Sequence, residues 1–120
     1  MREIEFRGKD VVTGEWRYGY VVICDNRSYI LKDIGGISYE VIPETVGQYI
    51  GKKDKNGVKI FTGDIIKFSG GGVWSVYYCE DTSMFRLRNG GLTCCVADGK
   101  LYSVIGNTTD NPELLETAHA

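Results

Sequence analysis

Proline, histidine and long apolar stretches are all scarce in this sequence. Its 120 residues include two prolines and a single histidine, His119, which is next to last. Chain ends are usually mobile, so we expect no positioned imidazole for triad or dyad catalysis. No apolar stretch approaches the ~20 residues that a transmembrane helix requires. The charged start, Met1–Glu5, lacks the apolar segment of a secretory signal, so we expect a cytoplasmic protein.

The cysteines lack the spacing of a metal or redox motif. They are Cys24, Cys79, Cys94 and Cys95, and no two of them form a C-x-x-C pair. We expect all four thiols to be reduced. Cys94 and Cys95 should pack as small apolar residues in a sheet, and a redox or metal role is the alternative. Cys94 and Cys95 are adjacent on a predicted strand, so their side chains should point to opposite faces.

Groups suited to catalysis are equally hard to find. The carboxylates fall mostly at turns or at alternating strand positions, which is typical of solvated faces, and no two are spaced for acid/base chemistry. We therefore expect no catalytic residue, no metal ligand and no cofactor, and a protein that is not an enzyme.

Glycine, by contrast, is abundant, with 16 residues in the chain. These glycines separate short runs rich in Val, Ile, Tyr, Phe and Trp, which is the pattern of short strands joined by tight turns. Because open sheet edges invite aggregation, such strands should close on themselves or pack as two sheets. We predict a mainly β fold, a small antiparallel barrel or sandwich of short strands with a short C-terminal helical turn. Residues 1–120 should form a single domain.

Local signals place several turns. Thr13-Gly14 should join the first two strands, residues 25–27 should form a second turn, and Asn56-Gly57 favours a tight hairpin. Pro43 cannot donate to a β-ladder, so we expect a strand to end there and a loop or a single helical turn to follow at residues 44–46.

The second half of the chain alternates in the way expected of an antiparallel meander. From Ser75 to Ile105, each predicted strand should pair with the next one along the chain. Arg86 and Arg88 should share one strand face. After the last strand, Asn111 suits the N-cap position and Pro112 the first position of a short helix.

Stretches at both ends and in the middle of the chain carry a family resemblance. The central stretches are Pro43–Gly51, Lys53–Gly57, Ile60-Phe61 and Gly63–Ile66. The terminal stretches are Met1–Arg7, Val104–Asn107 and Asn111–Leu115. Together they resemble the YopX family. The resemblance implies a small, predominantly β protein of phages or prophages of Gram-positive bacteria, so the expected compartment is the cytoplasm of the bacterial host cell. It implies no activity, because the biochemical function of the family is unknown, and no catalytic residues are carried over.

Two interpretations of the central stretch remain open. Its glycines could supply backbone angles that other residues disfavour, with Gln48 and Tyr49 anchoring a loop. Alternatively, the stretch forms a binding surface. The residues of this candidate structural signature are Pro43, Gly47, Gln48, Tyr49, Gly51, Gly57, Gly63 and Asp64.

Two hypotheses about function follow. The first is a protein-interaction or self-assembling module, because the chain contains eight tyrosines and two tryptophans, the usual anchors of protein interfaces. Its partner would be a second copy, forming a homo-oligomer, or another phage or host protein. The alternative is a purely structural role, in which these aromatic side chains fill the core of the sheets.

The second hypothesis is nucleic-acid binding through a lysine-rich hairpin. The net charge of -2 excludes a globally basic coat protein, but residues 52–67 hold five lysines against two aspartates. Tyr49, Phe61 or Tyr77 would stack on bases. The alternative is a solvated, lysine-rich turn that binds no partner. The basic residues of this candidate surface, for nucleic acid or another partner, are Lys52, Lys53, Lys55, Lys59, Lys67, Arg86 and Arg88.

Overall fold

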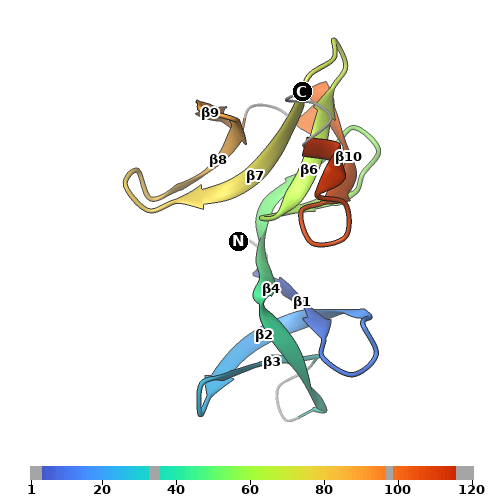
Figure 1. Cartoon of the computed structure of the whole chain (residues 1–120), viewed down its shortest axis with the longest axis vertical. Coiled ribbons are helices and arrows are strands. Elements are labelled where there is room, and N and C mark those ends of the chain that lie inside the picture. Colours follow the sequence, from blue (N-terminus) through green and yellow to red (C-terminus); the bar gives the residue numbers. More distant parts are fainter. Residues whose placement is uncertain (1–3, 33–35, 97–98, 116–120) are drawn as a thin grey trace. The chain divides into compact units, whose positions relative to one another are not determined.

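The structure, a computed structural model, describes residues 4–32, 36–96 and 99–115 (Figure 1). Strands account for 62% of it and form two antiparallel sheets, so the mainly β prediction is confirmed. The chain divides into two compact units, Met1–Tyr49 and Ile50–Ala120. His119, the only histidine of the sequence, lies outside the described residues.

The first unit is built on a ring of four strands. They are β1 (Phe6–Asp10), β2 (Trp16–Cys24), β3 (Arg27–Leu31) and β4 (Ser38–Lys53). Each pairs with the next, and β4 pairs back with β1. The ring therefore closes, which satisfies strand edges that would otherwise stay open.

The turns of this ring follow the local signals of the sequence. Asp25 and Asn26 have φ angles of 51° and 61° between the paired residues Cys24 and Arg27. These positive angles are those of a type I′ hairpin, whose twist matches that of the flanking strands. Gly14 has a φ angle of 74° in the β1–β2 turn. The register of β2 against both neighbours is thus set by short turns.

The prediction that a strand ends at Pro43 is wrong, because β4 continues through it. The register of β1 against β4 shifts from Arg7–Gly47 to Lys9–Ile42, so residues 43–46 bulge out of the ladder. The Thr45 hydroxyl accepts a hydrogen bond from the Lys9 N–H at 2.8 Å and donates one to the Ile42 carbonyl at 2.6 Å. Pro43 is exposed in this bulge, where its missing N–H costs no ladder bond.

The second unit contains a five-stranded sheet. Its strands are β6 (Asp64–Phe68), β7 (Val73–Cys79), β8 (Met84–Asn89), β9 (Leu92–Cys95) and β10 (Tyr102–Asn107). Their order is β10-β6-β7-β8-β9. The short strand β5 (Lys59–Phe61) pairs with β4, and a 3-10 turn (Gly99–Leu101) precedes β10.

The predicted meander is correct for three strands and wrong for the last. β7, β8 and β9 pair in succession, with Phe85 and Leu87 packed on the core. β10 pairs with β6 rather than with β9. Tyr102, at the start of β10, supports this pairing, because it lies opposite Phe68 of β6 and its buried ring packs on the Phe68 ring. Its hydroxyl donates a 2.8 Å hydrogen bond to the Val96 carbonyl inside the core.

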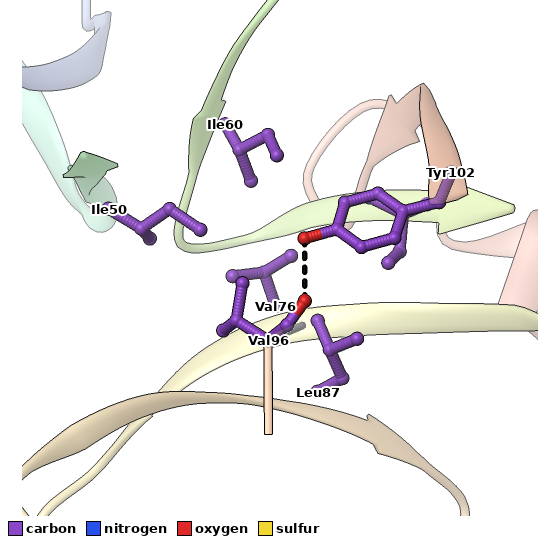
Figure 2. Close-up of a cluster of buried hydrophobic side chains, with 7 residues drawn as sticks. Ile50, Ile60, Val76, Leu87, Val96 and Tyr102 are labelled. Atoms are coloured by element: carbon purple, nitrogen blue, oxygen red, sulfur yellow. Dashed lines mark hydrogen bonds between the residues drawn. The ribbon is translucent and has the colours of Figure 1, made fainter. Parts of the chain in front are cut away.

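The core of the second unit lies against one face of this sheet (Figure 2). It contains mostly aliphatic side chains with one tyrosine, and the ring of Tyr102 meets that of Phe68 edge to face at 5.2 Å. Burying one such side chain contributes about 1.5–3 kcal/mol to stability. The members of the cluster are Ile50, Ile60, Ile66, Val76, Leu87, Val96 and Tyr102.

The predicted C-terminal helical turn is present at residues 113–115. The N–H of Leu115 donates to the carbonyl of Pro112, and that of Leu114 to Asn111. The Asn111 side chain accepts a hydrogen bond from the Asn107 N–H at 3.2 Å. Asn111 thus directly precedes the helical turn, as predicted, and its side chain ties that turn to β10.

Candidate interaction surface

The outward face of β2 carries three large, exposed side chains. Tyr18, Tyr20 and Val22 are 46%, 47% and 42% exposed. They lie on one side of the strand because side chains alternate between faces. Leu31 is opposite Tyr20 and Tyr29 is opposite Val22 on β3, both half-buried. We call these five residues the tyrosine face.

Gly19 explains how β2 presents this face. A Cβ at Gly19 would lie 2.1 Å from the Leu31 carbonyl oxygen, so no other residue fits without moving the backbone. Glycine within a strand pattern often marks such a close approach of two backbones. The sequence signal was therefore present between Tyr18 and Tyr20, but it does not reveal which face is exposed.

Two hollows flank Tyr18. One of about 350 Å³ is bordered by Ile4, Glu5, Tyr18, Gly19, Tyr20 and Lys32. The other, of about 220 Å³, is bordered by Trp16, Arg17, Tyr18, Lys32 and Tyr39. Tyr18 and Lys32 border both. The face is therefore a contoured surface that combines aromatic rings with cationic groups.

An ion-pair network fixes the residues beside Tyr18. Asp10 is buried, and its carboxylate accepts hydrogen bonds from the N–H groups of Val12 and Thr13, which lower its pKa. The Arg17 Nε lies 3.1 Å from the same carboxylate. The guanidinium carbon of Arg17 is 4.0 Å from the centre of the Tyr39 ring. The smaller hollow thus has walls held by hydrogen bonds and cation–π contact.

The candidate basic residues do not form one patch. Lys52, Lys53 and Lys55 are exposed at the end of β4 and in the following turn, and Lys59 is half-buried on β5. The Lys55 N–H donates to the Tyr102 carbonyl, so this turn lies along β10.

The remaining candidates lie elsewhere on the sheet. Lys67 is on β6, next to β10, whereas Arg86 and Arg88 are on β8. β10 is an edge strand, and β6 and β7 separate it from β8. The lysine-rich turn and the two arginines therefore occupy different parts of the sheet.

Two of the three predicted stacking residues are unsuitable. Tyr49 and Phe61 are buried, so neither can stack on a base. Tyr77 is half-buried on β7, opposite Arg86. The guanidinium carbon of Arg88 lies 4.0 Å from the centre of the Tyr77 ring.

The signature residues occupy positions that shape the backbone. Gly51, Gly57 and Gly63 have φ angles of 86°, 81° and 92°, whereas Gly47 lies in strand β4 opposite Arg7. Gln48 lies opposite Phe6. The N–H of Tyr49 donates to the Glu5 carbonyl, and the buried Asp64 carboxylate accepts from the Phe61 N–H. These contacts agree with a structural role for the central stretch.

Asp54 has a role that sequence reasoning missed. Its buried carboxylate accepts hydrogen bonds from the N–H groups of Asn56, Val58 and Val104. An aspartate two residues before Asn-Gly is the available signal, because aspartates commonly bond backbone two residues ahead in turns. The contact with Val104 is long-range and has no local signal.

The cysteines are free thiols in different surroundings. Cys95 and Cys24 are exposed, while Cys79 and Cys94 are half-buried. Cys94 packs against the core and Cys95 points away from it, as predicted from their adjacency. Across the described residues, no group of three His, Cys, Asp or Glu side chains is placed to hold a metal ion. No helix within the described ranges is long and apolar enough to cross a membrane.

Comparison with known proteins places the chain in a family. Comparison with curated proteins gives no match. Among solved structures, the crystal structure of protein EF1440 from Enterococcus faecalis is similar, with a TM-score of 0.63 and 25% sequence identity. The similarity covers 96% of this chain and 99% of that one. The model of the YopX protein family matches residues 5–116, nearly the whole chain, and the protein therefore belongs to the YopX family.

Proposed function

We propose that this protein is a non-enzymatic protein-interaction module that binds its partner through the tyrosine face. The observation that carries the proposal is the exposure of Tyr18, Tyr20 and Val22 side by side on one strand. Tyrosine provides a large contact area with few rotatable bonds, which makes it a common anchor at interfaces. Covering this face would remove apolar surface from water at about 25 cal/mol per Å².

The hollows beside Tyr18 support the same proposal. A flat patch offers little shape complementarity, whereas a contoured one can receive side chains of a partner. Lys32 borders both hollows and can pair with a carboxylate of that partner. The partner is either a second copy of this chain or another phage or host protein.

The setting of this function rests on the family resemblance. We propose that the protein is encoded by a phage or prophage and acts in the bacterial cytoplasm. Nothing in the described part of the chain suggests a reaction, and the proposal assigns none.

Sedimentation velocity and retention of binding proteins from host and phage-infected extracts test the proposal. The double variant Tyr18→Ala, Tyr20→Ala should lose self-association or retention of a defined partner. The control is Val12→Ser, because Val12 is 86% exposed but lies in the β1–β2 turn, away from the tyrosine face. A wild-type protein that is monomeric and retains no partner would contradict the proposal, as would equal loss in both variants.

A further inference from the structure

A positively charged surface lies in the second compact unit, Ile50–Ala120. The five strands β6 to β10 contain three basic side chains, Lys67, Arg86 and Arg88, and one carboxylate, Asp64. Asp64 is only 2% exposed, and it accepts a hydrogen bond from the Phe61 N–H. It therefore does not offset the positive charge at the surface of the sheet.

Arg86 and Arg88 lie on the face of β8 that points away from the core. Leu87 between them is fully buried in the core, and side chains on a strand alternate between faces. Tyr77 of β7 lies opposite Arg86 on this outward face. On the other side, Cys95 and Thr93 of β9 lie opposite Arg86 and Arg88, and both are exposed.

The contact between Arg88 and Tyr77 organises this surface. The guanidinium carbon of Arg88 lies 4.0 Å from the ring centre, which holds the side chain against the sheet. A guanidinium held in this way loses less conformational entropy on binding than one that is free in solvent. We call Tyr77, Arg86, Arg88, Thr93 and Cys95 the arginine face.

We propose that the arginine face binds single-stranded nucleic acid, independently of the tyrosine face. Guanidinium groups bind phosphate oxygens through paired N–H donors, and both guanidinium planes and tyrosine rings stack on exposed bases. A sheet surface without a projecting helix or ribbon does not enter the groove of a duplex, so unpaired strands are the fitting partner. The carboxylates of Glu80 and Asp81 lie in the turn beyond the Cys79–Met84 pair, at the end of this face.

The arginine face requires other residues than the lysine-rich hairpin that the sequence suggested for nucleic-acid binding. The Lys52–Lys55 segment lies along β10, on the far side of β6 and β7 from the arginines. Reversing the charge of two lysines in the turn, or of the two arginines on the arginine face, therefore shows which location binds. The two double variants change the net charge equally, so each is a control for the other.

Fluorescence anisotropy with labelled oligo(dT), single-stranded RNA and duplex DNA tests the proposal at several salt concentrations. Wild-type protein should bind the single strands with a Kd of roughly tens of micromolar at low salt. Two phosphate contacts predict a slope of log K against log salt of about -1.4, since each contact to single strands contributes ~0.7. Arg86→Glu with Arg88→Glu should weaken binding about tenfold or more, whereas Lys53→Glu with Lys55→Glu should change it less than about twofold.

Further variants keep the test decisive. If the charge reversal prevents folding, Arg86→Gln with Arg88→Gln should still flatten the salt dependence. Tyr77→Leu should weaken binding to single strands without changing the salt slope, because it removes the ring that holds Arg88 and leaves both positive charges in place. Tyr18→Ala with Tyr20→Ala should leave this binding intact. Absence of binding by folded wild-type protein at low salt, loss only in the lysine variants, or equal binding to duplex would overturn the proposal.

Discussion

The carboxylate of Asp54 accepts a 2.8 Å hydrogen bond from the backbone N–H of Val104, 50 positions further along the chain. Its second oxygen accepts hydrogen bonds from Asn56 and Val58 at 2.8 and 2.9 Å. A single buried side chain thus closes the lysine-rich turn and fastens it to strand β10. Asp54 therefore holds in place the segment that carries the exposed side chains of Lys52, Lys53 and Lys55.

Replacing Asp54 by alanine should destabilise the protein markedly. The variant leaves three backbone N–H groups without their acceptor, and hydrogen bonds to a charged group contribute about 1.5–3 kcal/mol each. Partial rescue by water makes about 2–3 kcal/mol the expected loss in the free energy of unfolding, measured by urea denaturation. Lys55→Ala is the matched control in the same turn and should change the free energy by less than about 0.5 kcal/mol. Equal stability of the two variants would show that the Asp54 contacts do not hold the turn.

Acid should weaken the fold through the same carboxylate. Burial acts to raise the pKa of Asp54, but its backbone hydrogen bonds outweigh burial and hold the pKa below the ordinary value of 3.8. The pKa of Asp10 is also lowered, mainly by the N–H groups of Val12 and Thr13. A carboxyl with a lower pKa in the folded state stabilises the fold above 3.8, and that contribution disappears as pH falls through the folded-state value.

The free energy of unfolding should therefore stay level between pH 7 and about 5 and decline below about pH 4. Asp54→Asn should give a shallower decline, because asparagine does not titrate. Urea denaturation at a series of pH values measures both curves. The explanation fails if the variant declines as steeply as the wild type.

Gly19→Ala should disrupt the tyrosine face. The added methyl group would approach the Leu31 carbonyl oxygen within 2.1 Å, so β2 and β3 must separate. A cost of about 3 kcal/mol is expected, at the upper end of ordinary overpacking. Gly70→Ala is the control, since a Cβ there meets open space. Thermal unfolding should show a clear loss for the first variant and almost none for the second, and similar melting of both would refute the close approach.

The thiols should differ in reactivity. Burial raises the pKa of Cys94, whereas hydrogen bonds from the side chain and backbone of Thr82 lower the pKa of Cys79. Iodoacetamide at pH 7 should therefore modify Cys79 and exposed Cys95 several-fold faster than Cys94, because the thiolate is the nucleophile. Thr82→Val should slow the reaction of Cys79 alone. Peptide mass spectrometry measures each rate, and labelling of Cys94 as fast as Cys95 would argue against its burial.

Local features of the fold could be predicted because their causes are local. Asp25 and Asn26 tolerate positive φ angles, and alternation around Leu87 correctly assigns Arg86 and Arg88 to one face. Pro43 was misleading because the bulge that accommodates it depends on the Thr45 hydroxyl and on Lys9 of another strand.

Long-range pairings had no such signal. Nothing near Tyr102 in the sequence indicates that its strand pairs with β6, since the residue that it pairs with and packs against, Phe68, lies far earlier in the chain. The candidate surfaces depend on the same kind of information. Tyr18 and Tyr20 alternate with smaller residues as buried side chains also do, and only closure of the ring leaves them on its outer side.

Site-specific photocrosslinking in the host cell tests the tyrosine face most directly. A photoreactive phenylalanine analogue would replace Tyr20 in one variant and Val12 in the other, and adducts would be identified by mass. The account predicts one adduct of defined mass from position 20, either a dimer or a complex with another protein, and none from position 12. Adducts of equal yield from both positions, or none from position 20, would contradict it.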